Sequence, residues 1–345
     1  MNELFEFPKY KITNRIRLIE LFGGIGSQAM ALRDIGADFE HYRLVEFDKY
    51  AVASYNAIHG TDFKVTDIRD VHGSDLGITE KDKYTYLVTY SFPCQSLSVA
   101  GKQAGMSRKD WEEGKSTRSG LLWEVERILK ELPKDDLPQV LLMENVTQVH
   151  AKKFIQDFNL WCDFLKSLGY KNFIKDLNGK DYGIPQSRNR CFMVSILSDG
   201  FVDYEFPKPQ ELKTVMKDYL EESIDEKYYI KSEKADKLIR ELIESGVLPT
   251  ENREQRTENR EQYAPSTYVS RDLEKSRSQT VSPQETGESV IGKKKVAAYV
   301  RPLGFIKKGT GKHQSNMVYD KNGLCPTEYA SLYKEPFKVV EKWQK

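Results

Sequence analysis

A cysteine at the entrance to a polar loop is the residue of this 345-residue chain best suited to covalent chemistry. Cys94 lies in SFPCQSLSVAGKQ, residues 91–103, between Pro93 and Gln95 and just after the apolar run YTYLVTY. Structural cysteines usually occupy apolar positions inside helices or strands, whereas a thiol with polar neighbours at a loop is accessible to a substrate. The position of Cys94 therefore favours a nucleophile.

Two other segments place polar groups after apolar runs. MENV supplies Glu144 and Asn145, and PQSRNR supplies Gln186, Arg188 and Arg190. Alternate residues of an extended segment point the same way, so both arginines can face one site. Taken alone, a glutamate at a strand end is commonly solvated and each arginine is a surface charge. Beside a nucleophilic cysteine, however, the glutamate and the arginines are suggestive of one shared site with Cys94.

A glycine turn predicts a nucleotide-type cofactor site. ELFGGIGSQ places Phe22, Gly24 and Gly26 between an apolar run and a helical pattern, where bare backbone approaches a ligand. Glu46, 22 residues after Gly24, can accept hydrogen bonds from ribose hydroxyls. Asp67 falls where a third strand is expected to end and could meet an adenine amino group, or simply cap a loop. No Gly-Lys-Ser/Thr follows the turn, so S-adenosylmethionine fits better than a nucleoside triphosphate.

Alternating strands and helices must position these residues. Short apolar runs predict strands at 16–22, 42–47, 84–90 and 139–145, and helical periodicity predicts helices at 27–35, 49–58, 120–132 and 154–168. This alternation predicts an α/β fold with a doubly wound parallel sheet covered on both faces, Rossmann-like. We expect this catalytic domain to span residues 1–200.

The rest of the chain has a different composition. A helix is expected at 232–245, a linker at 246–265 contains the repeated hexapeptide TENREQ, and small strands and loops follow. Residues 291–345 hold 12 Lys+Arg and 4 Asp+Glu, a net charge of +8 that leaves −7 for the remainder. This block indicates either a polyanion-binding surface or a solvated basic tail.

Composition limits the remaining classes. The chain has 39% hydrophobic residues, enough for a core, and neither a membrane-spanning run nor an apolar signal segment. The four cysteines and five histidines are not spaced as metal ligands or as a disulfide framework, so no metal is predicted. We expect a soluble protein of the cytoplasm.

The ordered motifs ELFGGIG, VEFDKYA, SFPCQSLS, TRSGLLWEV, MENV and QSRNR resemble those of the DNA (cytosine-5)-methyltransferase family, of bacterial or phage restriction-modification type. They cover about residues 16–200. The resemblance implies transfer of a methyl group from S-adenosylmethionine to carbon-5 of a cytosine flipped out of duplex DNA, through a covalent intermediate on Cys94. It implies that Glu144 acts at N3 of the base and that Arg188 supports developing charge.

The resemblance also assigns further residues. Implied catalytic neighbours are Gln95 and Arg190. Implied cofactor contacts are Phe22, Gly24, Ile25, Gly26, Glu46, Phe47, Asp67, Ile68, Pro93 and Leu121. Implied DNA contacts are Ser96, Ser98, Arg301, Lys307 and Lys308. Residues 201–345 would then be a small, mostly β or irregular target-recognition domain that binds double-stranded DNA, with a target sequence that these residues do not reveal.

Three alternatives stay open. A cysteine hydrolase would need a partner histidine, and no histidine lies in an accompanying motif. A non-enzymatic DNA-binding relative is disfavoured by Cys94, Glu144 and Arg188, and a nicotinamide-dependent dehydrogenase shares only the fold. The family's closing Gly-Asn-x-Val-Pro segment is absent, so we expect either a truncated relative that is weak or inactive, or an enzyme that a second polypeptide completes.

Overall fold

The computed structural model describes residues 9–97, 104–115, 117–220 and 233–246, with short strands beyond them. Internal contacts divide the chain into two compact units. The first comprises Met1–Leu177 and Asn189–Lys208, and the second comprises Asn178–Arg188 and Pro209–Lys345. The chain thus passes between the units three times. The domain boundary expected near residue 200 stays a prediction.

A six-stranded sheet organises the first unit, in the order β2-β1-β3-β4-β6-β5. Strands β1 to β4 are parallel, as predicted from the alternating pattern. The expectation of a wholly parallel sheet was wrong, because β6 pairs with β4 in the antiparallel sense. The strands span β1 Arg15–Leu21, β2 Phe39–Val45, β3 Tyr84–Tyr90, β4 Val140–Val146, β5 Tyr170–Asn178 and β6 Asn189–Leu197.

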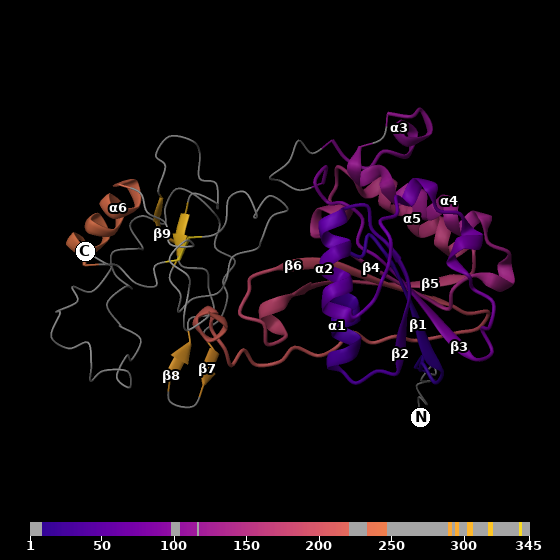
Figure 1. Ribbon diagram of the computed structural model, residues 1–345, viewed down its shortest axis with the longest axis horizontal. Helices are drawn as coiled ribbons and strands as arrows, with labels where there is room; N and C mark the ends of the chain where they lie inside the picture. Colours follow the sequence, from indigo (N-terminus) through magenta and orange to yellow (C-terminus); the bar gives the residue numbers. More distant parts are fainter. Residues whose placement is uncertain are drawn as a thin grey trace, which may run out of the picture. The chain divides into compact units, whose positions relative to one another are not determined.

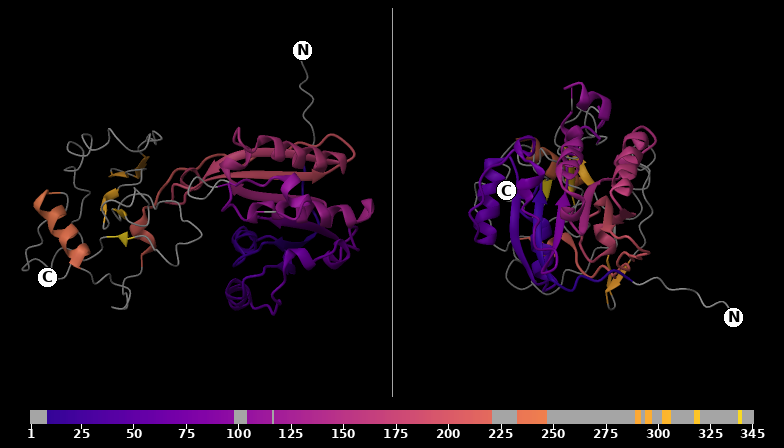
Figure 2. Two further views of the ribbon diagram at one scale, coloured as in Figure 1. Left: turned by 90° about the horizontal axis from the view of Figure 1, so that it is seen from above. Right: turned by 90° about the vertical axis from the view of Figure 1, so that its right-hand side faces the viewer.

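Helices cover both faces of this sheet (Figures 1 and 2). On one face, Ala29 of α1 packs with Ile16 and Leu18 of β1. On the other face, the large core joins Ile19 and Leu21 of β1 to buried residues of α4 and α5. Side chains of consecutive strand residues point to opposite faces, so β1 contributes to both layers. The helices span α1 Ser27–Asp34, α2 Lys49–His59, α3 Arg108–Glu112, α4 Leu122–Glu131 and α5 Ile155–Ser167.

Local sequence explains where the second helix begins and ends. The Asp48 side chain accepts hydrogen bonds from the backbone N–H groups of Tyr50 and Ala51, which caps the amino end of α2. Gly60 ends the helix in the left-handed conformation, which glycine adopts without steric cost. The helix thereby holds Tyr55 in the buried layer beneath the sheet edge.

The third strand expected to end at Asp67 is absent. Residues 61–67 have no regular structure, and Asp67 instead caps the 3-10 helix η1, Ile68–Asp70. The Asn56 side chain bonds to the backbone carbonyl and N–H of Phe63, and the Thr66 N–H donates to the Glu46 carbonyl, so this backbone has partners without a strand. Arg127 of α4 donates to the carbonyls of Ile68 and Val71, which follow, at 3.2 and 2.8 Å. The other 3-10 helices of this unit are η2 Gly73–Leu76, η3 Arg118–Leu121, η4 Lys134–Asp136 and η5 Thr147–His150.

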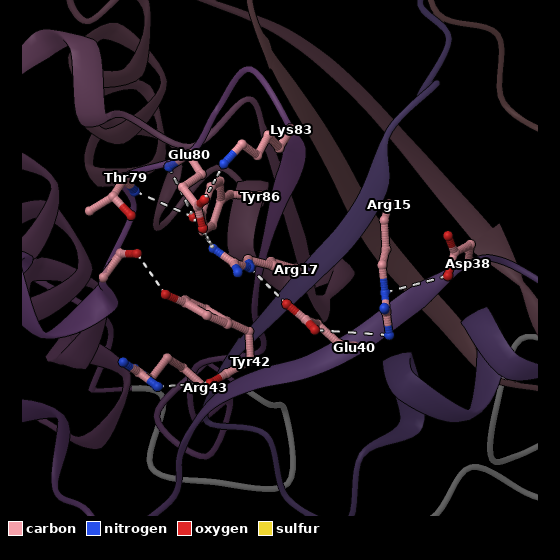
Figure 3. A network of polar contacts seen from close by, with 11 residues as sticks. Arg15, Arg17, Asp38, Glu40, Tyr42, Arg43, Thr79, Glu80, Lys83 and Tyr86 are labelled. Atoms are coloured by element: carbon pink, nitrogen blue, oxygen red, sulfur yellow. Dashed lines mark hydrogen bonds and ion pairs between the residues drawn. The ribbon is translucent and has the colours of Figure 1, made fainter.

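A cluster around Arg17 joins the amino-terminal halves of three strands (Figure 3). Arg17 of β1 donates to Glu40 of β2 at 2.7 Å and to Glu80, just before β3, at 3.1 Å. Its guanidinium carbon lies 3.6 Å from the Tyr84 ring centroid, and its Nη1 donates to the Tyr86 hydroxyl. Charge pairing and cation–π contact both stabilise a cation that is only 13% exposed. We refer to these residues as the Arg17 cluster.

The second unit contains short elements. Strands β7 and β8 pair antiparallel, and β9, β10 and β11 form a three-stranded sheet. Short strands in this region were predicted. Its elements are η6 Gly179–Asp181, η7 Met216–Tyr219, α6 Glu233–Glu244, β7 Ser289–Ile291, β8 Lys294–Val296, β9 Pro302–Phe305, β10 Met317–Tyr319 and β11 Lys338–Val339. Within the described part of the chain, no helix is both long and apolar enough to cross a membrane.

Candidate active site at the carboxyl edge of the sheet

The carboxyl ends of the parallel strands present most of the residues singled out from the sequence. Residues 22–26 follow β1, Glu46 follows β2, and residues 91–97 follow β3. Glu144 lies near the end of β4. Parallel strands end at the same edge, and ligands of open α/β sheets bind there. The first unit therefore gathers the predicted thiol, glycine turn and carboxylates along one edge.

The loop that carries Cys94 is held at its backbone by side chains from other elements. The Asn145 amide donates to the Phe92 carbonyl at 2.9 Å, and the Ser119 hydroxyl donates to the Pro93 carbonyl at 2.6 Å. The Ser119 oxygen also accepts from the Ser96 N–H at 3.2 Å. Ser119 and Asn145 are 0% and 2% exposed, so these bonds form out of water. They fix the thiol-bearing turn before any substrate arrives.

Cys94 itself is partly exposed at the rim of the core. Its carbonyl accepts from the Leu97 N–H at 2.9 Å, which closes a tight turn, while Leu97 is buried. Cys162 and Cys191 are buried inside the core. Burial raises the pKa of the Cys162 thiol to about 11 and that of the Cys191 thiol to about 12. Among the described cysteines, Cys94 alone is open to a ligand.

Gln95, next to the thiol, is oriented by an arginine. The Arg118 guanidinium, on η3, donates to the Gln95 side-chain oxygen at 2.7 Å. This contact and the Ser119 bonds both come from the TRSGLLWEV segment, residues 117–125. The segment therefore holds the Cys94 loop in place and also forms the start of α4.

Glu144 is paired with Arg190 across two antiparallel strands. Arg190 Nε lies 3.0 Å from Glu144 Oε1, and the two side chains are 12% and 23% exposed. The pairing is possible because β6 runs opposite to β4, which brings the first residues of β6 beside the last residues of β4. A charge-assisted hydrogen bond in a half-buried setting restricts the carboxylate to one orientation.

Arg188 belongs to the second unit, and Arg190 belongs to the first. The Asn178 side-chain oxygen accepts from the Arg188 N–H at 3.0 Å, and the Arg188 carbonyl accepts from the Gly179 N–H at 3.0 Å. These bonds define the backbone at Arg188. The role expected for the Arg188 side chain stays a prediction.

The glycine turn has an unusual backbone. Phe22 has a φ of 58°, in the left-handed region that residues with a side chain rarely adopt, and Gly24 and Gly26 also have positive φ. A Cβ at Gly24 would meet nothing within 4 Å, whereas a Cβ at Gly26 would lie 2.4 Å from His59 Nε2. Gly24 is thus required by conformation, and Gly26 by conformation and close packing.

Glu46 connects the turn to the second helix. Its Oε2 accepts from the Gly24 N–H at 3.0 Å, and its Oε1 accepts from the Asp48 N–H at 2.9 Å. The carboxylate therefore lies against the glycine turn, where a ribose would place its hydroxyls. This is the position that the sequence predicts for an acid that binds a nucleoside.

Large apolar side chains next to Glu46 and in the glycine turn are exposed to solvent. Phe47 is 65% exposed and Ile25 is 47% exposed, although both are large apolar residues. Leu121, at the end of η3, packs partly against the core. Exposed apolar groups beside a polar anchor are typical of a site that stacks a flat ring. Phe22, Ile25, Phe47, Pro93 and Leu121 keep their predicted cofactor role as a proposal.

Asp67 and Ile68 lie in different surroundings. Asp67 accepts from the Arg69 backbone and side chain, and the hydrogen bond from the Arg69 side chain lowers the pKa of the carboxyl group. Ile68 is 4% exposed and belongs to the core. In this arrangement Asp67 caps a 3-10 helix, so an adenine contact would have to coexist with the Arg69 pair.

Four predicted DNA contacts, Ser98, Arg301, Lys307 and Lys308, lie outside the described residues. Ser96 is described, and its N–H is bonded to Ser119. One mixed group of side chains lies elsewhere in the first unit: ligand atoms of His150, Asp176 and Cys191 fall within 4.8 Å of one another. His150 Nε2 and Asp176 Oδ1 are 2.9 Å apart and form a hydrogen bond. The prediction of no metal stays untested.

Sequence reasoning did not assign Ser119, Arg118 or Gln28, which position the site. Gln28 of α1 donates to the Ser91 hydroxyl at 3.2 Å, next to the loop of Cys94. The available signal was a set of small polar residues inside otherwise apolar motifs, GSQ and TRSG. Partners 23 to 63 residues apart along the chain cannot be deduced from such a pattern.

Solved structures show the same fold. The Entamoeba histolytica methyltransferase EhMeth superposes with a TM-score of 0.50 at 19% identity, over 66% of each chain. A putative DNA modification methyltransferase encoded within an E. coli prophage superposes with a TM-score of 0.50 at 17% identity, over 90% of this chain and 82% of its own. These similarities support an α/β methyltransferase fold.

Curated relatives are closer in sequence. The orphan methyltransferase M.SssI of Spiroplasma monobiae is 34% identical in an alignment 267 residues long, and the match covers 62% of this chain and 67% of the relative. The type II methyltransferase M2.ScrFI of Lactococcus lactis subsp. cremoris is 34% identical in an alignment 265 residues long, and the match covers 63% of this chain and 71% of the relative. The family model of the C-5 cytosine-specific DNA methylases matches residues 16–321. With its thiol loop, glycine turn and paired carboxylate at one sheet edge, the chain belongs to the C-5 cytosine-specific DNA methylase family.

Proposed function

We propose that this chain transfers a methyl group from S-adenosylmethionine to carbon-5 of a cytosine in a specific sequence of double-stranded DNA, through a covalent bond to Cys94. The observation that carries the proposal is the fixed loop of Cys94, which emerges at the same sheet edge as the glycine turn and Glu46. The family supplies the reaction class, and the side chains supply the mechanism.

The residues present fit the cofactor. The Glu46 carboxylate lies against the Gly24 N–H with an exposed Phe47 and Ile25 beside it, which suits ribose hydroxyls and an adenine ring. No cationic loop for a triphosphate is needed. When bound, S-adenosylmethionine supplies an electrophilic methyl group on a sulfonium. The chain's part is to hold that group in line with the base.

Cys94 makes carbon-5 nucleophilic. Its thiolate forms a bond to carbon-6, and the electron pair of the 5,6 double bond moves into the ring toward N3. Glu144, held by Arg190, acts at N3 in its protonated form and donates a hydrogen bond or its proton there, and Arg188 supports the developing charge. Carbon-5 then takes the methyl group as the sulfonium bond breaks. A base removes the proton from carbon-5, the carbon-6–sulfur bond breaks, and Cys94 leaves as a thiolate.

The substrate base must leave the DNA stack to reach this thiol. Unstacking costs a few kcal/mol, which protein contacts to the flipped base and the DNA offset. We assign these contacts to Ser96 and Ser98 in the Cys94 loop and to Arg301, Lys307 and Lys308 in the basic block. The setting is the cytoplasm of a bacterial or phage-infected cell, where the DNA is accessible.

A trapping experiment tests the chemistry. Duplex DNA with 5-fluorocytosine at target sites should form a stable covalent adduct with the protein when S-adenosylmethionine is present, because fluorine cannot leave as a proton does. Random-sequence DNA read at base resolution for 5-methylcytosine first identifies the target. A peptide mass showing the base attached at Cys94 supports the proposal, and turnover on ordinary DNA without any adduct on fluorinated DNA contradicts it.

A second candidate is that a further polypeptide completes the site. The exposed Ile25, Phe47 and Tyr50, at 47%, 65% and 73%, favour it, because a covering segment would bury them. Methylation by the purified chain, with its mass verified, separates the two cases. Full turnover by the chain alone rejects the second polypeptide, whereas activity that appears only after addition of a host lysate fraction supports it.

A further inference from the structure

A buried carboxylate lies directly behind the glycine turn. Glu20, in β1 and two residues before Phe22, is 0% exposed. The Tyr55 hydroxyl of α2 donates to Glu20 Oε2 at 2.5 Å, and the Ala29 N–H of α1 also interacts with this carboxylate. The reaction proposed above does not use this acid. Burying a charge in this position costs free energy of folding, and such a cost is commonly retained where the charge serves function.

A directional chain of hydrogen bonds begins at this carboxylate. Because the Tyr55 hydroxyl donates to Glu20, its oxygen accepts from His41, whose Nδ1 lies 2.7 Å away. The ring centroids of His41 and His59 are 4.8 Å apart. His59 Nε2 lies 3.0 Å from the Ile25 carbonyl, which can only accept, so this nitrogen carries the proton. The chain of contacts ends on the glycine turn itself.

The turn rests on this cluster by close contact as well. A Cβ added at Gly26 would lie 2.4 Å from His59 Nε2 and 2.7 Å from the Tyr55 ring. The Tyr55 and His59 rings are themselves packed at 4.4 Å between centroids. Tyr55 and His59 therefore pack directly against the backbone of residues 25 and 26. These residues are next to Gly24, whose N–H is bonded to Glu46.

We propose that Glu20 is a positioning residue for the cofactor site: through Tyr55 and His59 its carboxylate sets the glycine turn in the geometry that binds S-adenosylmethionine. The proposal rests on the proposed function only in naming that cofactor. Cofactor binding is measured directly, so a wild-type protein that does not bind would count against the function, whereas equal binding by the variants would count against this inference alone.

Titration supplies a signature of this role. Burial raises the pKa of Glu20 to about 7, and the hydrogen bond from Tyr55 and the Ala29 N–H oppose the rise only in part. Tyr55 of α2 is the titratable group that contacts Glu20, and His41 of β2 and His59 of α2 contact Tyr55 in turn. Burial, then the neighbouring His59, lowers the pKa of His41. Protonation of His41 keeps its N–H donor to Tyr55, so loss of cofactor affinity below pH 7 is assigned to Glu20.

Ionisation of Glu20 with rising pH should lower the folding stability, whereas it should raise the affinity for the cofactor. The pKa of Glu20 is higher in the folded state than its ordinary 4.5, so stability falls as the pH rises from about 4.5 to 7, and the penalty persists above 7. Replacing the acid by its neutral amide removes that penalty. A residue with a purely structural role would lose stability when replaced.

The experiment measures S-adenosylmethionine affinity by calorimetry and thermal stability without ligand, at pH 6, 7 and 8. We expect Glu20→Gln to bind about 10-fold more weakly than wild type at pH 8 and to be at least as stable. Wild-type affinity should fall between pH 8 and pH 6, and the variant's affinity should be flat. Tyr55→Phe breaks the same chain of contacts and should weaken binding to a similar degree.

Controls make each outcome decisive. Tyr170→Phe removes another buried tyrosine hydroxyl, one bonded to the Pro138 carbonyl, and should lower stability without changing the pH profile of binding. The combined Glu20→Gln/Tyr55→Phe variant should bind no more weakly than either single variant, because both changes break one connection. Wild-type affinity and pH profile in Glu20→Gln, or in Tyr55→Phe if the first variant does not fold, would overturn the inference.

Discussion

The two ends of the same parallel strands differ in how far their side chains are buried and paired. At the amino end, the Arg17 cation contacts Glu40 and Glu80 (Figure 3). It also lies against the Tyr84 ring, and its side chain is only 13% exposed. At the carboxyl end, Phe47 and Ile25 are exposed and Cys94 is partly exposed. Polar side chains at this end bond to the backbone of the Cys94 loop, and the thiol of Cys94 stays accessible at the edge of the sheet.

This difference shows how one sheet can be both a scaffold and a site. Arg17 connects three strands and contributes to stability, whereas Asn145 and Ser119 hold the carbonyls of the Cys94 loop. We therefore expect substitutions at the amino end to change unfolding and those at the carboxyl end to change binding or chemistry. The following predictions test that separation.

Cys94→Ser should have the largest effect. Methyl transfer should fall by roughly three orders of magnitude or more, because a hydroxyl is a far weaker nucleophile than a thiolate. The unfolding midpoint and S-adenosylmethionine affinity should stay close to wild type, since serine is close to cysteine in size and the loop is held through the backbone carbonyls of Phe92, Pro93 and Cys94. Turnover assays and calorimetry on the same preparation measure both. Comparable loss of stability and activity would break the proposed separation.

Arg17→Ala should be the most destabilising change at the amino end. It removes two ion pairs and a cation–π contact from a residue that is 13% exposed, and we expect a loss of about 2–4 kcal/mol in the free energy of unfolding. Turnover per folded molecule should be unchanged. Arg15→Ala is the matched control, because Arg15 is 48% exposed and pairs with the exposed Asp38, so its loss should cost less than about 1 kcal/mol. Urea denaturation distinguishes the two variants.

Glu46→Ala should weaken S-adenosylmethionine binding by about 1.5–3 kcal/mol, a factor of roughly 10 to 150. The expected cause is the loss of a charged acceptor for ribose hydroxyls. Binding to target DNA should change by less. Calorimetry with the cofactor and fluorescence anisotropy with labelled DNA provide the comparison. An unchanged cofactor affinity would show that the ribose is held by another group.

The smallest expected effect separates two neighbouring glycines. Gly24→Ala meets only the strain of a positive φ, about 1–2 kcal/mol, because its Cβ would enter open space. Gly26→Ala has the same strain and must also displace His59 and Tyr55, so it should be less stable than Gly24→Ala by about 1 kcal/mol or more. Thermal unfolding of the pair measures the difference. Equal stability would mean that the turn does not rest on these rings.

Much of this arrangement was predictable because it depends on local signals. Short apolar runs ended by glycine or polar residues located β1 to β4, and parallel strands necessarily place their ends along one edge. The position of Glu46 against Gly24 followed from that logic. The polar loop of Cys94 was likewise apparent from residue types alone.

The rest depends on contacts that sequence patterns do not encode. An apolar run carries no information on strand direction, so the reversal of β6, and with it the Glu144–Arg190 pair, could not be predicted. In place of the strand expected before Asp67, the Phe63 backbone bonds to the Asn56 side chain and the Thr66 N–H bonds to the Glu46 carbonyl. Glu20 belonged to a motif, but its burial follows from the packing of α2.

The unequal burial of the thiols has a consequence for chemical probing. Cys162 and Cys191 are enclosed in the core with raised pKa values, while Cys94 is partly exposed beside the glycine turn. A mild alkylating reagent should therefore label Cys94 first among these three, and its rate should drop when a ligand covers the edge. The same exposure makes Cys94 a suitable attachment point for a selective covalent inhibitor. Oxidation of the Cys94 thiol should likewise abolish methyl transfer without unfolding the protein.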